Sequence, residues 1–460
     1  MTMIRDEPAS TGGLSEKLAI GLDAIAQGDH SPEAAASAKT RLLHAVRVAL
    51  TSRDLPAAEL AWSATGTNSG NCVVIGRAER LSGPDAAFVN GVTSHSSLKE
   101  DCGPGGLREG SHPGTYVIPA ALAAADMANS SGSALLRGVI AGYEAVGRIG
   151  AASPPGIGLR RFRPVGVMGP FGAAAAAAAV WNLGPAATSR TLAIAANMAA
   201  GTNQGIYEGT MEPYFHAGVS ARNGILAAQL AAAGAVTSHQ SLEGEFGFFE
   251  TYGGEQGATD EVTVERDEYA VSRVGTKRFA ACMQNQQTLA LIIDTAPADL
   301  NVGDIVGVTI RRPATGTNGL GSPGVSRIPP YSNMLQAQMS ARFTAAAALA
   351  GAPVEDPTYF RNSYADSAIT ALARKITLDN STDGSVAVEI KLPDRVIVLD
   401  SDMSSTLFPS AEEIRDRFLR DVGASEGFAH AGKLAALIDD LDQLTLATQL
   451  TDALCMPRVP

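Results

Sequence analysis

The residues best suited to chemistry are polar side chains in three glycine- and proline-rich stretches of the 460-residue chain. Histidine transfers protons near neutral pH, and carboxylates orient it or take the proton themselves. Guanidinium and ammonium groups bind carboxylates. If these stretches are loops at the ends of packed helices, their side chains can converge on one pocket. They carry His95, Lys99, Glu100, Asp101, Arg108, Glu109 and His112, then Arg160, Arg161 and Arg163, then Tyr207, Glu208, Glu212, Tyr214 and His216.

Proton transfer is the role expected of the first stretch. His112 precedes a proline at the start of a predicted helix, where it could act as a general acid or base or simply cap the helix. Glu100 and Asp101 are adjacent carboxylates, and their repulsion can raise one pKa into a useful range. They could orient His112 or take a proton, although a solvated acidic turn explains them equally well. Lys99 could supply a catalytic amine, but an exposed lysine is the favoured interpretation.

The remaining candidates would bind an anionic substrate. Arg163 could bind a carboxylate, and Lys277 with Arg278 could bind an anion at a strand end in a second domain. Glu212 could serve as a base, or form a salt bridge. His216 could contact substrate, or be a hydrogen-bonded structural histidine. The candidate substrate-binding set is Arg163, His216, Glu212, Tyr214, Lys277, Arg278 and His95.

Several common signatures are absent from the sequence. It has no GxxxxGK[ST] loop, no HExxH, no GxSxG and no CxxC motif, so nucleotide hydrolysis, zinc peptidase and serine hydrolase chemistry lose support. The glycine-rich run at 103–106 could hold an anion, but a plain turn is favoured. Four cysteines without paired spacing indicate reduced thiols in the cytoplasm and no zinc site; they are Cys72, Cys102, Cys282 and Cys455.

The charge balance narrows the range of partners. Lys and Arg total 35 against 47 for Asp and Glu, which gives a formal charge of −12. Without a basic run, nucleic acid is an unlikely partner, and a negative surface does not attract anionic membranes. The polar N-terminus lacks the apolar core of a secretory signal, and residues 165–201 are too often interrupted by Gly, Pro and Asn to span a membrane. A small molecule in the cytoplasm is the expected partner.

The elements that must position these residues are mostly helical. Helical spacing of apolar residues predicts two helices within 14–51, with Ser31 and Pro32 as the cap and first turn of the second. Loops are predicted at 99–115, 151–165 and 202–216. Further helical segments are predicted within 57–80, 84–98, 116–128, 132–150, 166–183, 185–201 and 217–234.

The pattern changes near residue 262. Alternating β-branched residues predict strands in VTVERDEYAVS, DIVGVTIRRP, VAVEIKL and RVIVLDS, with helices at 283–296 and 332–350 between them. Helix returns over 410–453, beginning at Ser410. We therefore predict a mostly α protein with a large all-helical domain and a smaller α+β domain. The expected boundaries are 1–264, 265–405, and 406–460 for C-terminal helices that return to the helical domain.

A series of motifs runs through most of the chain in a fixed order. They are FVNGVTSHSS, HPGTYVIPAALAAAD, LLRGVIAGYEAVGRIG, GVMGPFGAAAAAAAVWNLG, LAIAANMAAG, HAGVSARNGILAAQLAAAG, LEGEFGFFETYGG, KRFAACMQNQQTLALIID and AQMSARFTAAAALAG. In this order they resemble the MmgE/PrpD superfamily, which includes 2-methylcitrate dehydratase, cis-aconitate decarboxylase and iminodisuccinate epimerase. The resemblance covers about residues 14–455 and implies a helical domain, an α+β domain, a homodimer, and an active site between the domains. It also implies proton movement next to carboxylates without a metal or organic cofactor.

Departures from the resemblance matter as much as the match. Leu98 stands where a catalytic Asp is expected, Arg163 replaces a histidine, Glu212 replaces a lysine, and Phe343 falls near a tyrosine of the decarboxylases. His112 and His216 are retained. Decarboxylation is thus disfavoured. The first hypothesis is a lyase or isomerase, a dehydratase or epimerase, that moves a proton alpha to a carboxylate or carbonyl. The alternatives are a repurposed scaffold for cyclisation or isomerisation of a bulkier biosynthetic intermediate, and a non-catalytic binding protein.

Overall fold

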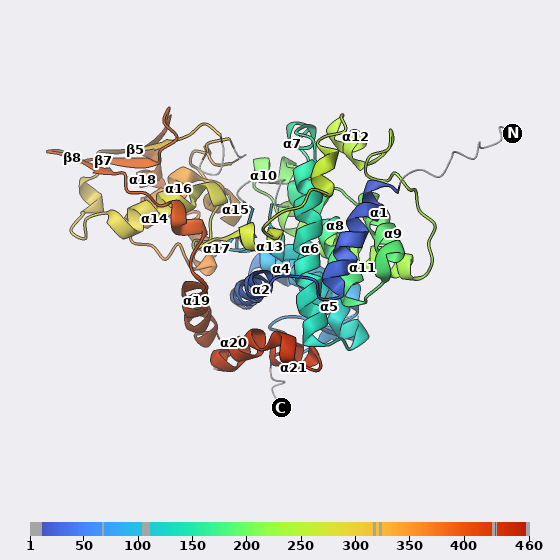
Figure 1. The fold of residues 1–460 in the computed structure, drawn as a ribbon. Coiled ribbons are helices and arrows are strands. Elements are labelled where there is room, and N and C mark those ends of the chain that lie inside the picture. Colours follow the sequence, from blue (N-terminus) through green and yellow to red (C-terminus); the bar gives the residue numbers. More distant parts are fainter. Residues whose placement is uncertain are drawn as a thin grey trace.

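The computed structural model of the chain describes residues 12–456, apart from 67–68, 104–110, 316–318, 322–323, 426–427 and 429. Arg108, Glu109 and most of the run 103–106 therefore lie outside the described residues. The predicted mostly helical fold with a smaller α+β part is confirmed (Figure 1). Within the described part of the chain, no helix combines the length and hydropathy needed to cross a bilayer.

A helical body forms the larger part of the molecule (Figure 1). Its centre is α8, an alanine-rich helix that packs against α5, α6, α9 and α11. Small residues permit this approach: a Cβ on Gly142 of α6 would lie 2.8 Å from the Gly172 carbonyl of α8. The body comprises α1 (Leu14–Ala26), α2 (Pro32–Ser52), α3 (Pro56–Thr65), α4 (Gly83–His95), α5 (Gly114–Ala128), α6 (Gly132–Ala152), α7 (Gly156–Leu159), α8 (Pro164–Val180), α9 (Gly184–Ala196), α10 (Gln204–Glu208), α11 (Glu212–Ala232), α12 (Phe248–Gly253) and α13 (Ala270–Arg273), with a short β1 (Ser69–Val73) and β2 (Arg80–Leu81) pair.

A second part holds a four-stranded sheet at the opposite end of the molecule from α9 (Figure 1). The strand order is β6-β5-β7-β8, in which β5 and β6 are parallel and the other pairs antiparallel. Its apolar core is a separate cluster of buried side chains. The elements are α14 (Gln286–Thr295), β5 (Gly307–Arg312), α15 (Met334–Met339), α16 (Ala341–Leu349), α17 (Phe360–Ser363), α18 (Ser367–Arg374), β6 (Ile376–Asn380), β7 (Ala387–Lys391) and β8 (Val396–Leu399).

The C-terminal helices lie against the helical body. They are α19 (Ala411–Gly423), α20 (Ala431–Asp439) and α21 (Thr448–Ala453). Helices α19 and α20 contact α2, and α21 contacts α5, so their apolar residues join the core of the helical body. Ser410 caps α19 by accepting a hydrogen bond from the Glu413 amide, as predicted.

Several segments differ from the sequence-based predictions, and the predicted loops 99–115 and 151–165 contain a two-residue strand and α7. The predicted loop 202–216 contains α10 and the start of α11, because Pro213 fits the first turn of a helix. VTVERDEYAVS forms no strand; Val262 instead enters the helical core from a 3₁₀ turn. The helix predicted over 332–350 is broken at Ser340, whose side chain caps α16.

A short two-stranded ladder joins the helical body to the second part. β3 (Asp101–Cys102) pairs antiparallel with β4 (Gly275–Thr276), and Asp101 lies opposite Thr276. In an antiparallel ladder the next residues outward also oppose each other. The register therefore brings Glu100 to Lys277, although 177 residues separate them.

Candidate active site

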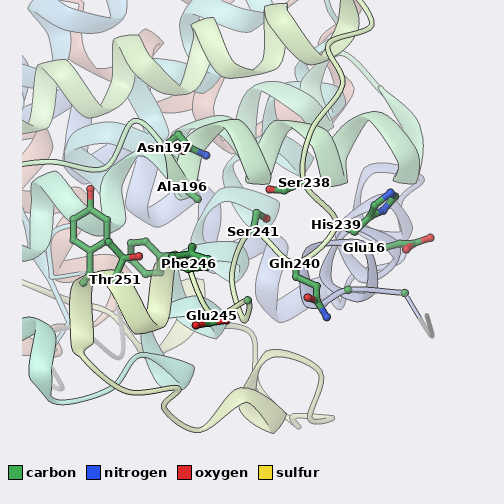
Figure 2. Close-up of a pocket in the computed structure, with 16 residues that line it drawn as sticks. Glu16, Ala196, Asn197, Ser238, His239, Gln240, Ser241, Glu245, Phe246 and Thr251 are labelled. Carbon is green, nitrogen blue, oxygen red and sulfur yellow. The ribbon is translucent and has the colours of Figure 1, made fainter. Parts of the chain in front are cut away.

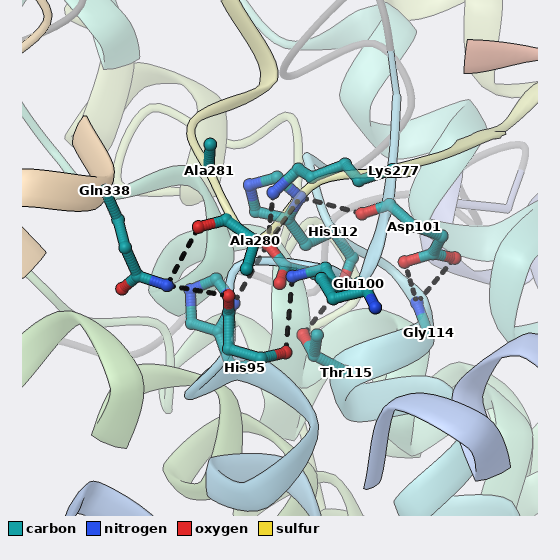
Figure 3. Close-up of polar contacts among 12 residues, drawn as sticks. His95, Glu100, Asp101, His112, Gly114, Thr115, Lys277, Ala280, Ala281 and Gln338 are labelled. Carbon is teal, nitrogen blue, oxygen red and sulfur yellow. Dashed lines mark hydrogen bonds and ion pairs between the residues drawn. The ribbon is translucent and has the colours of Figure 1, made fainter. Parts of the chain in front are cut away.

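Glu100 is the centre of a buried polar cluster (Figure 3). Its Oε1 accepts a 2.5 Å hydrogen bond from Lys277 Nζ and lies 3.4 Å from His95 Nδ1 and 3.5 Å from His112 Nδ1. Burial alone would raise the pKa of Glu100, but Lys277 and the two imidazoles hold it well below its usual range. Glu100 is thus an ionised carboxylate that accepts from Lys277 and has two imidazole nitrogens nearby.

His112 is held in one tautomer. Its Nδ1 lies 2.8 Å from the Asp101 backbone carbonyl, which can only accept, so Nδ1 carries the proton and Nε2 the lone pair. Burial, and next the charge of Lys277, hold the pKa of His112 well below its usual range. The imidazole is therefore neutral at pH 7, with Nε2 available as a base.

His95 links the cluster to Arg163. Arg163 donates to His95 Nε2 across 3.2 Å, because a guanidinium cannot accept, and this leaves the His95 proton on Nδ1 facing Glu100. Arg163 Nε is buried without a protein partner, as is Glu100 Oε2. Such unpaired buried groups are costly in a protein interior, and they mark a place where a polar ligand can bind.

Asp101 has different contacts from those expected of a proton-transfer partner. Both carboxylate oxygens accept from the Gly114 amide at 3.0 Å, and Oδ2 also accepts from the Tyr143 hydroxyl at 2.5 Å. Burial raises the pKa of Asp101 to about 6. Its side chain therefore anchors the start of α5, while its backbone carbonyl orients His112.

Tyr214 and His216 enter from the first turns of α11, not from a loop. The Tyr214 ring meets His95 edge-on, with 6.2 Å between ring centroids. Burial, and next Arg163, lower the pKa of His216 to about 4, and its Nδ1 is buried without a partner. Gly201, with φ of 125°, leaves room for this ring, because a Cβ there would lie 3.1 Å from His216 Nε2.

Three predicted site residues are not part of the cluster. Lys99 extends toward Asp421 of α19, at 3.8 Å, and burial lowers the pKa of Lys99 to about 7. Arg278 pairs with Asp294 and Glu355 on the second part and stacks on the Phe279 ring. Glu212 is exposed on the first turn of α11.

Sequence reasoning missed two residues that hold the cluster together. Gln338 of α15 donates to the carbonyls of Ser97 and Ala280, and its Oε1 accepts from Tyr214 at 3.4 Å (Figure 3). Tyr143 of α6 fixes Asp101. In the sequence, each of these residues is a polar side chain within a largely apolar helical segment. That pattern does not indicate which group the side chain binds.

Two cavities lie at different distances from this cluster. One of about 1040 Å³ is formed by the N-terminal end of the described chain and by residues around 238–252, and no cluster residue lines it (Figure 2). Another, of about 380 Å³, is lined by Ser96, which follows His95, and by Tyr214. The second cavity is therefore the one next to the polar cluster.

Comparison with known proteins identifies the family to which the chain belongs. A sequence model of the MmgE/PrpD N-terminal domain matches residues 16–261, more than half of the chain. The chain belongs to the MmgE/PrpD family. The match includes every cluster residue that the helical body provides, and Lys277 follows it in the sequence.

One curated relative is human cis-aconitate decarboxylase. It is 33% identical over 174 residues, which are 37% of this chain and 35% of the relative. The match thus spans about a third of that protein's length.

Two of the positions at which the resemblance implied a departure from the family are buried. Leu98 lies in an apolar cluster with Tyr214 and Cys282, and its φ of 56° is left-handed. Phe343 lies in the second core, with its ring 5.1 Å from that of Tyr331. Both side chains therefore pack among apolar residues.

Proposed function

We propose that the chain is an MmgE/PrpD lyase or isomerase that removes a proton alpha to a carboxylate or carbonyl of an organic acid. The observation that carries the proposal is the buried neutral His112, whose Nδ1 is bound to the Asp101 carbonyl and whose pKa is lowered by burial and by the charges of Lys277 and Arg163. A base next to fixed cations is the arrangement that enolate-forming chemistry needs.

The charge of the cluster favours an anionic substrate. Among the described residues, Glu100 faces two cations, Lys277 and Arg163, while the histidines are neutral; the neighbouring Asp101 carboxylate faces a further cation, Arg41. An acid bound at Arg163 Nε would give that buried donor a partner and balance the extra positive charge. Its α-carbon would then be held close to His112.

The reaction begins when His112 Nε2 takes the α-proton and the C–H electron pair moves onto the carboxylate or carbonyl. Lys277 and Arg163 stabilise the developing oxyanion without having to reorganise, because Glu100 and His95 already fix them. The electron pair then expels a β-hydroxyl, which leaves as water with the proton from His112, or the carbon recovers a proton on another face. These outcomes are dehydration and epimerisation.

The test is proton exchange in deuterated water. Succinate and other small di- and tricarboxylates are incubated with the protein, and loss of the α-proton signal is followed by ¹H NMR. We expect exchange with the wild type and a loss of about 100-fold or more in His112→Asn, the usual contribution of a general base. His430→Asn is the matched control, because His430 is an exposed residue at the start of α20.

If proton exchange is unchanged in His112→Asn, His112 is not the general base. Absence of exchange with every acid, in a protein that is folded by circular dichroism, would favour a non-catalytic binding role.

A further inference from the structure

An apolar cavity of about 380 Å³ lies where the helical body meets the second part. It is lined by residues of α3, of the start of α11, and of α15 and α17, and the last two helices lie between the body and the sheet in Figure 1. Its lining is mainly aliphatic and aromatic. Arg361 is the one charged residue among the described residues that line it. This size and character are typical of a site for part of a small organic ligand.

The cavity and the polar cluster are neighbours, because Tyr214 contacts both. Tyr214 lines the cavity and meets the His95 ring edge-on. Ser96 lines it and follows His95 in the chain. Behind the wall, Leu98 packs in the same apolar cluster as three cavity-lining residues, Ala57, Tyr214 and Leu335.

Leu98 lies behind this wall, because it is buried and does not itself line the cavity. A carboxylate at that position would put a charge among these apolar side chains, whereas leucine continues their packing. Its φ of 56° is left-handed, which a residue other than glycine adopts where the surrounding packing holds it. The Arg163 guanidinium and the apolar cavity thus lie on either side of the contacting His95 and Tyr214 rings.

We infer that the substrate is an organic acid with a bulky apolar substituent, whose carboxylate binds at Arg163 and whose substituent occupies this cavity. The inference rests on the proposed function and adds the substrate class to it. A small polycarboxylate would leave the cavity unused. An acid with an alkyl or aryl arm matches both ends of the site.

The test is a homologous series of ligands. Binding of succinate, butylsuccinate and hexylsuccinate to the full chain is measured by isothermal titration calorimetry. Each methylene buried in an apolar site contributes about 0.8 kcal/mol, so we expect affinity to rise about fourfold per methylene until the cavity is filled.

Two substitutions test where the apolar substituent and the carboxylate of the ligand bind. Met334→Trp places a larger side chain at the wall of the cavity, and it should abolish the dependence on chain length while succinate binding persists. Met403→Trp is the matched control, because Met403 is half-buried against the second core and does not line the cavity. Arg163→Gln should weaken every member of the series by a similar factor.

The outcomes separate the two proposals. Equal affinities along the series, or a chain-length dependence that Met334→Trp leaves intact, would overturn the apolar arm and leave the proposed function standing. A chain-length dependence that is insensitive to Arg163→Gln would place the acid elsewhere, and would overturn both.

Discussion

The buried ion pair between Glu100 and Lys277 is the interaction between single residues on which the stability of the site depends most. Both side chains are almost fully buried, and Glu100 Oε1 also lies 3.4 Å from His95 Nδ1 and 3.5 Å from His112 Nδ1. Removing one partner of a buried ion pair leaves an uncompensated charge, whereas exposed charges contribute little. The stability of the site therefore depends on the pair being complete.

Lys277→Met should lower the free energy of unfolding by about 3–5 kcal/mol, since it leaves the Glu100 carboxylate buried without its cation. Lys391→Met, the same substitution at an exposed strand end, should change it by less than about 1 kcal/mol. Urea denaturation of both variants measures the difference. Equal effects would show that the Glu100–Lys277 pair is not closed in solution.

The protonation of His112 should set the acid limb of the pH profile. A base must be neutral, so kcat/KM falls as pH drops through the His112 pKa, which burial and Lys277 hold well below the usual 6.5. We expect full proton exchange at pH 6.5 and a decline only below it. The profile is measured by ¹H NMR, and a limb above pH 6.5 would exclude His112 as the base.

At the scale of elements, the β3–β4 ladder and the start of α5 position the base. The ladder places Glu100 against Lys277, and Asp101 holds the first amide of α5 and the Tyr143 hydroxyl. Asp101 has a folded-state pKa of about 6, above the unfolded value of about 3.9. The folded state therefore binds the proton more readily than the unfolded state between these two values.

This difference predicts a specific dependence of stability on pH. Because the native carboxyl is the weaker acid, its contribution to stability falls as pH rises from about 4 to about 6, by on the order of 2–3 kcal/mol. Asp101→Asn removes the titration. The free energy of unfolding of the wild type relative to Asp101→Asn should therefore decrease between pH 4 and pH 6.5. A constant difference in urea denaturation would contradict the raised pKa.

At the scale of the whole molecule, α11 carries an apolar stripe that the described chain does not cover. Val219, Leu226 and Leu230 are each about 41% exposed and recur at helical spacing beside half-buried Phe215. Contiguous exposed apolar surface of this kind marks an interaction site. A second copy of the chain is the partner that the family resemblance implies.

Leu226→Glu with Leu230→Glu should therefore convert a homodimer to a monomer in light scattering coupled to size exclusion. Val396→Glu is the control, because Val396 is also an exposed apolar residue, 56% accessible, but lies on β8 and not on α11. A wild type that is monomeric at micromolar concentration would refute the prediction, as would a double variant that remains dimeric.

The sequence by itself determined the local elements and their order. Apolar periodicity and caps such as Ser31 and Ser410 act over a few residues, so most helices and β5, β7 and β8 were predictable. It also singled out His112, Glu100, Lys277 and Arg163 as candidates. The domain boundaries at residues 264 and 405 stay a prediction. The described residues form two separate large apolar cores, one in the helical body and one in the second part.

Only the tertiary structure decided which candidates meet. The β3–β4 register joined residues 177 positions apart, while Lys99 went to Asp421 and Arg278 to Asp294. Sequence neighbours such as Lys99 and Glu100 diverge in the bend between α4 and β3, where Leu98 has a left-handed backbone. Which way each one points is fixed by long-range pairing and burial, and these are properties of the folded chain that no local pattern encodes.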